Sequence, residues 1–307
     1  MPTSSARASP LAVNEERVLT KADFFVDVQL WPLNRALNPR GWLENFPPQE
    51  KEHAVNLLNA FLYFSSPLCD ALLLGAFRSL SKYFDSRDAP FVTTQGLWQG
   101  FCDSVLIVHV EGENPSTTDS GYVFARASRK VLGIVEARIV SPQVALERLI
   151  QSGPLPVVFV DDFVGSGNQF TTGWHRRIQL SDGTEHSFDQ LEKARGGKFF
   201  YCPLICTELG AESIHLECPK VVLEPAHLLS DNYNALSSNS HLWPDHLRPT
   251  AYDFIENASR RAGIPLGKWK GFQDLGLAIA FEHSVPDATL PLFHWEGNGW
   301  IPLIPRR

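Results

Sequence analysis

The chain has 307 residues, of which 44% are apolar and 20% charged, a composition typical of a folded globular protein. Its formal net charge of −7 argues against a protein that coats nucleic acid, because such a protein needs a basic face. We find no signal-peptide pattern at the N-terminus, and the five cysteines are an odd number, so we expect a cytoplasmic protein in a reducing compartment.

The N-terminal third is predicted to be helical. Residues 1–20 are small and polar, so we expect a disordered segment or a tether there. A helical extension is then predicted over residues 21–100. Its first helix follows Pro47 and Pro48 and repeats apolar residues at helical spacing, and its second helix covers residues 68–84.

The stretch 54–77 is apolar enough to raise the question of a membrane span. Polar residues interrupt it, and Pro67 lies in its middle, which a bilayer tolerates poorly. We therefore expect two amphipathic helices that pack onto a core, and no association with a membrane.

From Ser104 onward, short apolar runs alternate with helical stretches. This alternation predicts a parallel sheet with helices on both faces, a three-layer α/β fold. The domain is expected over residues 101–307, with a C-terminal cap from about residue 230. The predicted strands are 104–110, 157–160, 198–204, 220–225 and 275–283, and the predicted helices are 121–133, 169–179 and 207–214.

The central motif is VVFVDDFVGSGNQF at residues 157–170, in which an apolar strand runs into two acids and then a glycine-rich turn. Ligands of open parallel sheets bind beyond the carboxyl ends of the strands, so Asp161 and Asp162 are expected at that edge. The turn at 165–169 precedes a helix, whose free N–H groups and dipole favour a phosphate. A ribose 5-phosphate offers hydroxyls to the acids and a phosphate to the turn.

Three other phosphate motifs do not fit these residues. A P-loop needs a lysine and a hydroxyl residue at its end, where this chain has Gly173 and Trp174. The dinucleotide fingerprint needs a glycine in place of Phe170, and it would set two carboxylates against a pyrophosphate. Haloacid-dehalogenase phosphatases have their acids two positions apart rather than adjacent.

Residues 157–169 resemble the signature of type I phosphoribosyltransferases. The resemblance implies that Asp161 and Asp162 hold the ribose hydroxyls and the hydration shell of a magnesium ion, and that the turn wraps the 5-phosphate. The family usually has hydroxyl residues where this chain has Gly165 and Gln169, so two side-chain donors are missing. The implied 5-phosphate ligands are Gly165, Ser166, Gly167, Asn168 and Gln169.

A second segment resembles the pyrophosphate loop of that family. A strand at 104–110 is followed by the loop ENPSTTDSG at 113–121 and by a helix that ends in Leu and Gly. Two arginines three positions apart share a helical face and could neutralise phosphate charge, or they could be solvated helix charges. The implied pyrophosphate ligands are Ser120, Gly121, Arg126 and Arg129.

The whole layout resembles a divergent subgroup of phosphoribosyltransferase-like proteins from bacterial anti-phage gene clusters, some of them beside retron reverse transcriptases. The resemblance rests on residues 41–66, on DDFVGSGNQF and on LGLAIAFEHSVPDATLPLFHW at 275–295. It implies partners from the same defence system, among them a reverse transcriptase with its RNA or DNA.

Several isolated residues carry alternative interpretations. His283 follows the last predicted strand and could protonate a leaving base, or it could fasten the tail by a hydrogen bond. Glu208 could face the same cleft, or it could be a surface carboxylate. The basic run at 260–270, with Trp269 among the charges, could grip single-stranded nucleic acid or form a solvated face.

A zinc site is an alternative for one cluster of the sequence. Cys202, Cys206, His215 and Cys218 have zinc-ligand residue types, but Cys202 lies in an apolar run typical of buried thiols.

Three functions remain open from the sequence. The first is a magnesium-dependent pentosyltransferase or glycosidic-bond cleaver that acts on phosphoribosyl pyrophosphate or a nucleotide. The second is a catalytically inactive nucleotide sensor that regulates a partner, and the third is a scaffold with a degenerate site. Retention of both acids favours the enzyme, whereas the missing loop hydroxyls favour the sensor.

Overall fold

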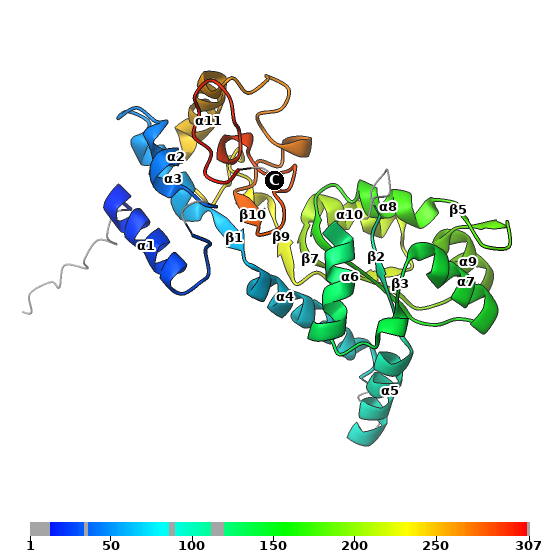
Figure 1. Cartoon of the computed structure of the whole chain (residues 1–307). Coiled ribbons are helices and arrows are strands. Elements are labelled where there is room, and N and C mark those ends of the chain that lie inside the picture. Colours follow the sequence, from blue (N-terminus) through cyan, green and yellow to red (C-terminus); the bar gives the residue numbers. More distant parts are fainter. Residues whose placement is uncertain (1–12, 34–35, 86–89, 112–119, 306–307) are drawn as a thin grey trace, which may run out of the picture. The chain divides into compact units, whose positions relative to one another are not determined.

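The computed structural model describes residues 13–33, 36–85, 90–111 and 120–305 (Figure 1). The chain folds into two compact units. The first combines residues 1–65 with 231–307, and the second is residues 66–230. We describe each unit separately.

The second unit, here called the sheet unit, is built on a parallel sheet with the order β3-β2-β4-β7-β8, in which β9 also pairs with β7. Every pair in this sheet is parallel. The predicted parallel α/β fold is therefore confirmed. The strands are β2 (Leu106–His109), β3 (Ile139–Val140), β4 (Val157–Val164), β7 (Phe199–Thr207), β8 (Val221–Leu223) and β9 (His227–Leu229).

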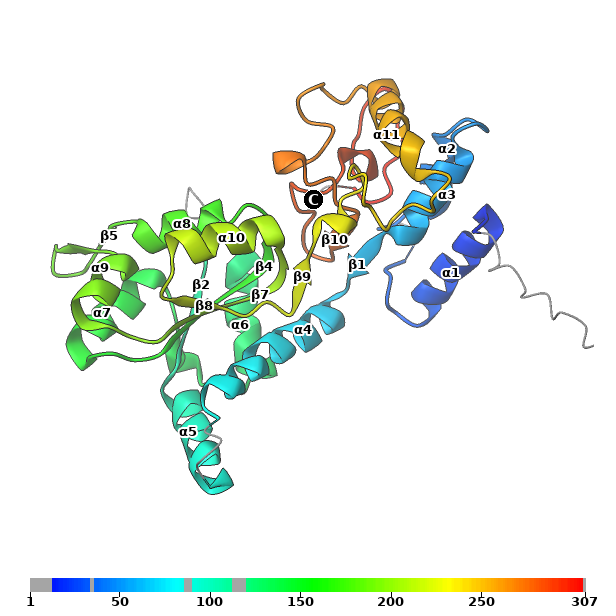
Figure 2. The same ribbon diagram turned by 180° about the vertical axis from the view of Figure 1, so that it is seen from behind.

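Helices cover both faces of this sheet (Figures 1 and 2). One face packs against a core with side chains from α7, α8, α9 and α10, while α4 and α6 lie against β7 and β4 and against each other. A short antiparallel hairpin follows α8. The elements are α4 (Ser66–Ser79), α5 (Phe91–Ser104), α6 (Ser120–Val131), α7 (Pro142–Ser152), α8 (Asn168–His175), β5 (Ile178–Gln179), β6 (Glu185–His186), α9 (Phe188–Arg195) and α10 (Glu208–Glu217).

The first unit, here called the terminal unit, joins the two ends of the chain around an aromatic core. Trp42 stacks on Phe293 with ring centroids 5.3 Å apart, and its indole N–H donates to the carbonyl of Leu292. Such contacts between distant segments explain why the ends form one unit. Its elements are α1 (Glu15–Asp27), α2 (Pro39–Glu44), α3 (Lys51–Ala60), β1 (Leu62–Phe64), α11 (Arg248–Ala262) and β10 (Ile279–Phe281).

Three expectations differ from the structure. The last predicted strand exists as β10, but it pairs with β1 in a separate parallel sheet rather than with the main sheet. Of the segment 1–20 expected to be disordered or a tether, residues 1–12 lie outside the described residues, and residues 15–20 belong to α1, capped by the Asn14 side chain. The division at residue 100 also differs, because α4 and α5 lie in the sheet unit, where α4 packs on β7.

The apolar stretch at 54–77 forms α3, β1 and α4, so the two predicted helices are confirmed with a short strand between them. No helix within the described residues has the length and apolar character needed to cross a bilayer.

Candidate functional site

Strand β4 carries both acids of the central motif, but it does not end at Val160 as predicted. It continues to Val164, and Asp161 pairs in register with Pro203 of β7. The side chains of Asp161 and Asp162 are therefore buried, with exposures of 2% and 5%. Both acids were expected at the carboxyl edge of the sheet, directly after the strand, but they lie within β4 because residues 163 and 164 extend the ladder.

Asp161 is held by two donors. Its Oδ1 accepts the backbone N–H of Asp162 at 3.0 Å, and its Oδ2 accepts the hydroxyl of Tyr201 on β7 at 3.1 Å. Burial, and then the neighbouring Asp162 carboxylate, raise the pKa of Asp161 well above its ordinary value. Burial likewise raises the pKa of Tyr201, which stacks on Phe170 of α8 with centroids 4.1 Å apart. The fold therefore favours the protonated form of Asp161.

The turn after β4 is fixed by close backbone packing against α10. Gly167 has a φ of 80°, and a Cβ there would lie 2.9 Å from the carbonyl oxygen of Gly210. A Cβ on Gly210 would lie 2.5 Å from the carbonyl oxygen of Gly165. Thr207 joins the two segments, since its Oγ1 donates to the Gly165 carbonyl at 2.5 Å and accepts the Gly210 N–H at 3.0 Å. The shape of the turn thus depends on glycine at positions 167 and 210.

The N-terminus of α8 presents free donors from this turn. Gly167 is the N-cap and supplies no side chain, and the Asn168 N–H makes a long 3.4 Å bond to Ser166 Oγ. Within the described part of the chain, the N–H groups of Gln169 and Phe170 have no backbone acceptor. Asn168 and Gln169 are exposed. Uncapped amides at an accessible helix start are a binding site for an anion.

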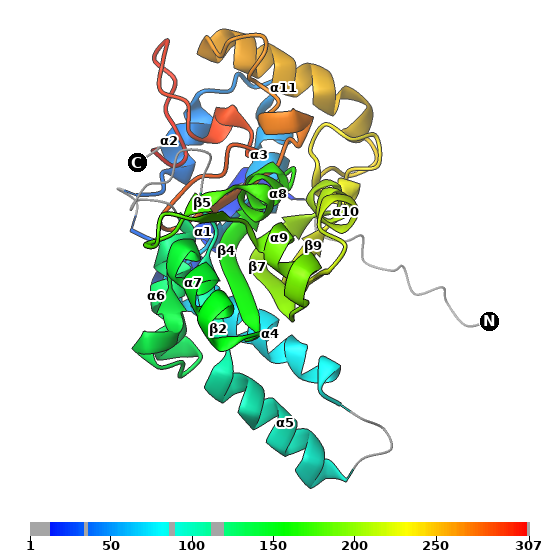
Figure 3. The ribbon, with the colours of Figure 1, turned by 90° about the vertical axis from the view of Figure 1, so that its right-hand side faces the viewer.

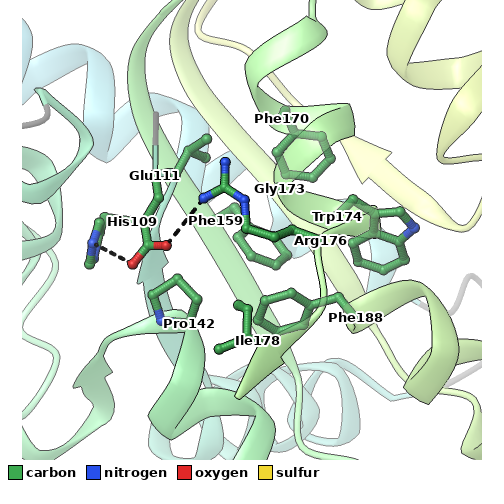
Figure 4. Close-up of a pocket in the computed structure, with 11 residues that line it drawn as sticks. His109, Glu111, Pro142, Phe159, Phe170, Gly173, Trp174, Arg176, Ile178 and Phe188 are labelled. Carbon is green, nitrogen blue, oxygen red and sulfur yellow. Dashed lines mark ion pairs between the residues drawn. The ribbon is translucent and has the colours of Figure 1, made fainter. Parts of the chain in front are cut away.

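Beside the acids, β2 ends in an ion network that the sequence interpretation missed (Figure 4). Glu111 lies 3.6 Å from Arg176, which follows α8, and 3.7 Å from His109 at the end of β2. The three groups border an apolar cavity lined by Phe159, Phe170, Trp174 and Phe188 among others. Its volume is about 20 Å³, room for one water molecule. The sequence signal for this network was the polar residues His109 and Glu111, which follow the apolar run 105–108.

The predicted pyrophosphate ligands are only partly described. Residues 112–119, which make up most of the loop, lie outside the described residues. Ser120 and Gly121 are described only as the first residues of α6. Arg126 is exposed on α6, and Arg129 pairs with Glu136 at 2.9 Å. Arg129 lies nine residues along the helix from Ser120, or about 13 Å. That placement fits the solvated-charge alternative for Arg129.

His283 follows β10 in the terminal unit, and β10 pairs with β1 rather than with a strand of the main sheet. Glu208 is exposed in the first turn of α10, as the surface alternative expects.

In the basic run, Arg261 forms an ion pair with Glu50, and Trp269 is 4% exposed. A buried indole cannot stack on a nucleotide base, so the nucleic-acid interpretation of this run loses its aromatic platform.

The zinc alternative is not supported. Among the described residues, no three His, Cys, Asp or Glu side chains are placed to hold a metal ion. Burial raises the pKa of Cys206 and of Cys218 to about 12, and Cys202 donates to the Ala76 carbonyl. These thiols are buried hydrophobic side chains.

Comparison with known families agrees with this geometry. The profile of the protein family described as PRTase-CE matches residues 39–306, which is most of the chain. This chain belongs to the PRTase-CE family. Membership supports a phosphoribosyltransferase-like protein and, at a coarse level, pentosyl transfer. A comparison with curated proteins found no match.

Asp161 and Asp162 are ligand types that Mg²⁺ takes, since that ion binds through one or two carboxylates together with waters and substrate phosphates.

Proposed function

We propose that this protein binds a ribosyl phosphate at the turn 165–169 and makes or breaks the glycosidic bond of phosphoribosyl pyrophosphate or of a nucleotide. One observation carries the proposal. The uncapped, accessible N-terminus of α8 follows, after residues 163–167, a buried acid pair in the second half of the central parallel strand β4. An anion site and a negative potential are thus joined by one short turn.

The 5-phosphate would accept hydrogen bonds from the backbone N–H groups of Gln169 and Phe170, and the dipole of α8 would attract its negative charge. The ribose would then lie toward Asp161 and Asp162. During transfer, the bond between C1 and the pyrophosphate oxygen breaks and its electron pair leaves with pyrophosphate. A nitrogen of the base, or a water oxygen, bonds to C1 and releases its proton to solvent. The positive charge that develops on the ribose is stabilised by the negative charge of the acid pair.

Asp161 and Asp162 would hold Mg²⁺ through its water shell, and the ion, when bound, would neutralise charge on the leaving pyrophosphate.

Calorimetry with phosphoribosyl pyrophosphate and Mg²⁺, followed by product analysis, tests the proposal. Gln169→Glu places a negative charge at the start of α8 and should weaken binding about tenfold. Gln151→Glu makes the same change at an exposed position on α7 and should leave binding unchanged. Binding that is equal in both variants would place the phosphate elsewhere.

Two observations favour the second candidate, a nucleotide sensor without turnover. Gly165 and Gln169 replace the hydroxyl donors that the phosphoribosyltransferase signature usually has, and both acids are buried. Binding that depends on Gln169 but yields no product in prolonged incubation would identify the sensor.

We further propose that the protein acts in the cytoplasm as an effector of a bacterial anti-phage system, together with partners that include a reverse transcriptase and its nucleic acid. Support comes from the resemblance over residues 41–66, 161–170 and 275–295. Growth of cells that express the protein alone and with its neighbouring genes, with and without phage, tests this role. The Asp161→Asn/Asp162→Asn variant should abolish both protection and toxicity, and full protection by that variant would exclude the enzymatic effector.

A further inference from the structure

A groove lies at the amino ends of the central strands of the main sheet. Helix α5 leads into β2, and its face with Leu97 and Gly100 forms one wall of the groove. Residues of the segments 154–156 and 195–198, which lead into β4 and β7, form the other wall. Figure 3 shows α5 leading away from this end of the sheet. The groove therefore lies at the opposite end of β4 from the turn 165–169.

The walls of the groove are fixed by contacts within the sheet unit. The N–H of Val157 donates to the carbonyl of Lys198 at 2.9 Å, which joins the two segments of one wall. On the α5 side, Phe101 packs on Phe84 with ring centroids 4.7 Å apart and on Phe200 of β7 at 5.6 Å. Binding sites for small molecules are usually preformed in this way.

The groove has the size and the lining of a small-molecule site. Its volume is about 590 Å³, within the roughly 300–1,000 Å³ of pockets that bind drug-sized ligands. Gly96 and Gly100 leave a flat strip along α5, since a Cβ on either residue would meet no atom within 4 Å. The apolar lining residues are Phe84, Leu97, Phe101, Pro154 and Pro156. Proline rings and a glycine strip are flat surfaces, on which a planar apolar body can stack.

The charges in the groove are positive. Among the described residues that line it, Arg195 and Lys198 are charged and none is acidic. Arg195 Nη1 donates to the Ile150 carbonyl at 2.7 Å, and Lys198 Nζ lies 4.9 Å from the centroid of the Phe84 ring. Both residues are exposed, and neither forms an ion pair with a described carboxylate. Their charges are therefore available to an anionic ligand.

We propose that this groove binds a planar aromatic anion, which is a flat ring system that carries a carboxylate, sulfonate or phosphate. The ring system lies on the strip of Gly96 and Gly100, between α5 and the prolines of the opposite wall. Its negative group accepts a hydrogen bond from Lys198 Nζ, with Arg195 adding positive charge. The proposal adds a second site at the far end of the strands and does not depend on the proposed function.

The position of Lys198 limits the shape of the ligand. Its Nζ lies over the ring of Phe84, a residue of the apolar lining, so the cation and the apolar surface are adjacent. A ligand that uses both must carry its negative group directly on the ring system or one or two bonds away. A peptide segment fits less well, because its N–H groups would meet apolar side chains that accept no hydrogen bond.

Calorimetry of the full chain with naphthoate, a planar ring system with one carboxylate, tests the proposal. We expect a dissociation constant on the order of 0.1 mM, and binding of the uncharged naphthamide should be weaker by about threefold or more. Lys198→Gln should reduce naphthoate binding to the level of naphthamide. Lys268→Gln removes an exposed lysine of the terminal unit and serves as the control, with wild-type binding expected.

A second pair of variants blocks the groove while preserving the fold. Gly100→Leu places a side chain in the groove and should abolish binding of both compounds. Gly75→Leu makes the same change at an exposed position of α4 outside the groove and should bind naphthoate as the wild type does. A Cβ meets no atom within 4 Å at either position, and leucine is the better helix former, so both melting temperatures should be kept or raised.

Four results would overturn the proposal. The first is a wild-type protein that does not bind naphthoate, and the second is equal affinity for naphthoate and naphthamide. The third is naphthoate binding that survives in Gly100→Leu or that Gly75→Leu also removes, since either places the compound elsewhere. The fourth is tighter binding of octanoate than of naphthoate, which would identify an aliphatic acid as the ligand.

Discussion

The hydroxyl of Tyr201 donates a hydrogen bond to Asp161 Oδ2 across the boundary between β7 and β4, at 3.1 Å. Both residues are buried, and they lie on adjacent strands of the same parallel sheet. This bond favours the ionised form of Asp161, whereas burial and the Asp162 carboxylate favour the protonated form more strongly. The protonation state of the site therefore depends on a balance that single substitutions can shift.

We expect Asp161→Asn to remove the activity and to stabilise the fold at neutral pH. Because the pKa of Asp161 is higher in the folded chain than in the unfolded chain, the folded chain binds more protons between the two values. The free energy of unfolding therefore falls as pH rises through that window. Asparagine cannot ionise and keeps the oxygen that accepts the Asp162 N–H.

Urea unfolding from about pH 4 to about pH 8 checks this prediction. The variant should lose part of the decline in stability with pH, and at neutral pH it should gain roughly 1 kcal/mol. The same pH dependence in both proteins would show that Asp161 ionises freely in the fold.

Tyr201→Phe should raise the pKa of Asp161 further, because it removes a donor to the ionised carboxylate. The expected effects are a loss of about 1 kcal/mol of stability and a pH–rate profile displaced to higher pH. Phenylalanine keeps the ring that stacks on Phe170, so packing is retained. A reduced rate with an unchanged pH profile would assign Tyr201 a packing role alone.

Gly210→Ala, a change on α10, should displace the turn 165–169. Its Cβ would lie 2.5 Å from the Gly165 carbonyl oxygen and 2.7 Å from Val164 Cγ1, so the turn or α10 must move. We expect a loss of roughly 1–3 kcal/mol of stability and weaker binding of phosphoribosyl pyrophosphate. Gly173→Ala is the control, because a Cβ there meets no atom within 4 Å. Equal binding by both variants would show that the turn is not the anion site.

Glu111→Gln should weaken the ion network at the end of β2. Arg176 and His109 each lose a charged partner, but all three side chains retain some exposure, so the expected loss of stability is about 1 kcal/mol. The measurement is urea unfolding at low and high salt. Salt should reduce the difference between variant and wild type, and a difference independent of salt would point to packing instead.

The fold could be predicted from the sequence to the extent that each strand is a continuous apolar run. Strands β2, β4, β7 and β8 were predicted for this reason, whereas β3 and β9 span two or three residues and give no periodic signal. The C-terminal run was recognised as a strand but assigned to the wrong sheet. Its partner Leu62–Phe64 lies more than 200 residues earlier, and no local pattern encodes such a pairing.

The site could be predicted in its residues but not in its depth. The sequence motif identifies the two acids and the turn. However, β4 continues past the acids, with Asp161 paired with Pro203, and both aspartates are therefore buried. The ion network of Glu111 was missed because Arg176 lies 65 residues away in sequence and meets it only through the packing of α8.

The two glycines at the contact between the turn and α10 also set limits on redesign. A Cβ on Gly167 or on Gly210 would lie closer than 3.0 Å to a backbone oxygen of the other segment, so a larger residue there displaces the main chain. Tighter capture of an anion can instead be engineered at Ser166, Asn168 and Gln169, where hydroxyl or cationic side chains can be added while the main chain stays where it is.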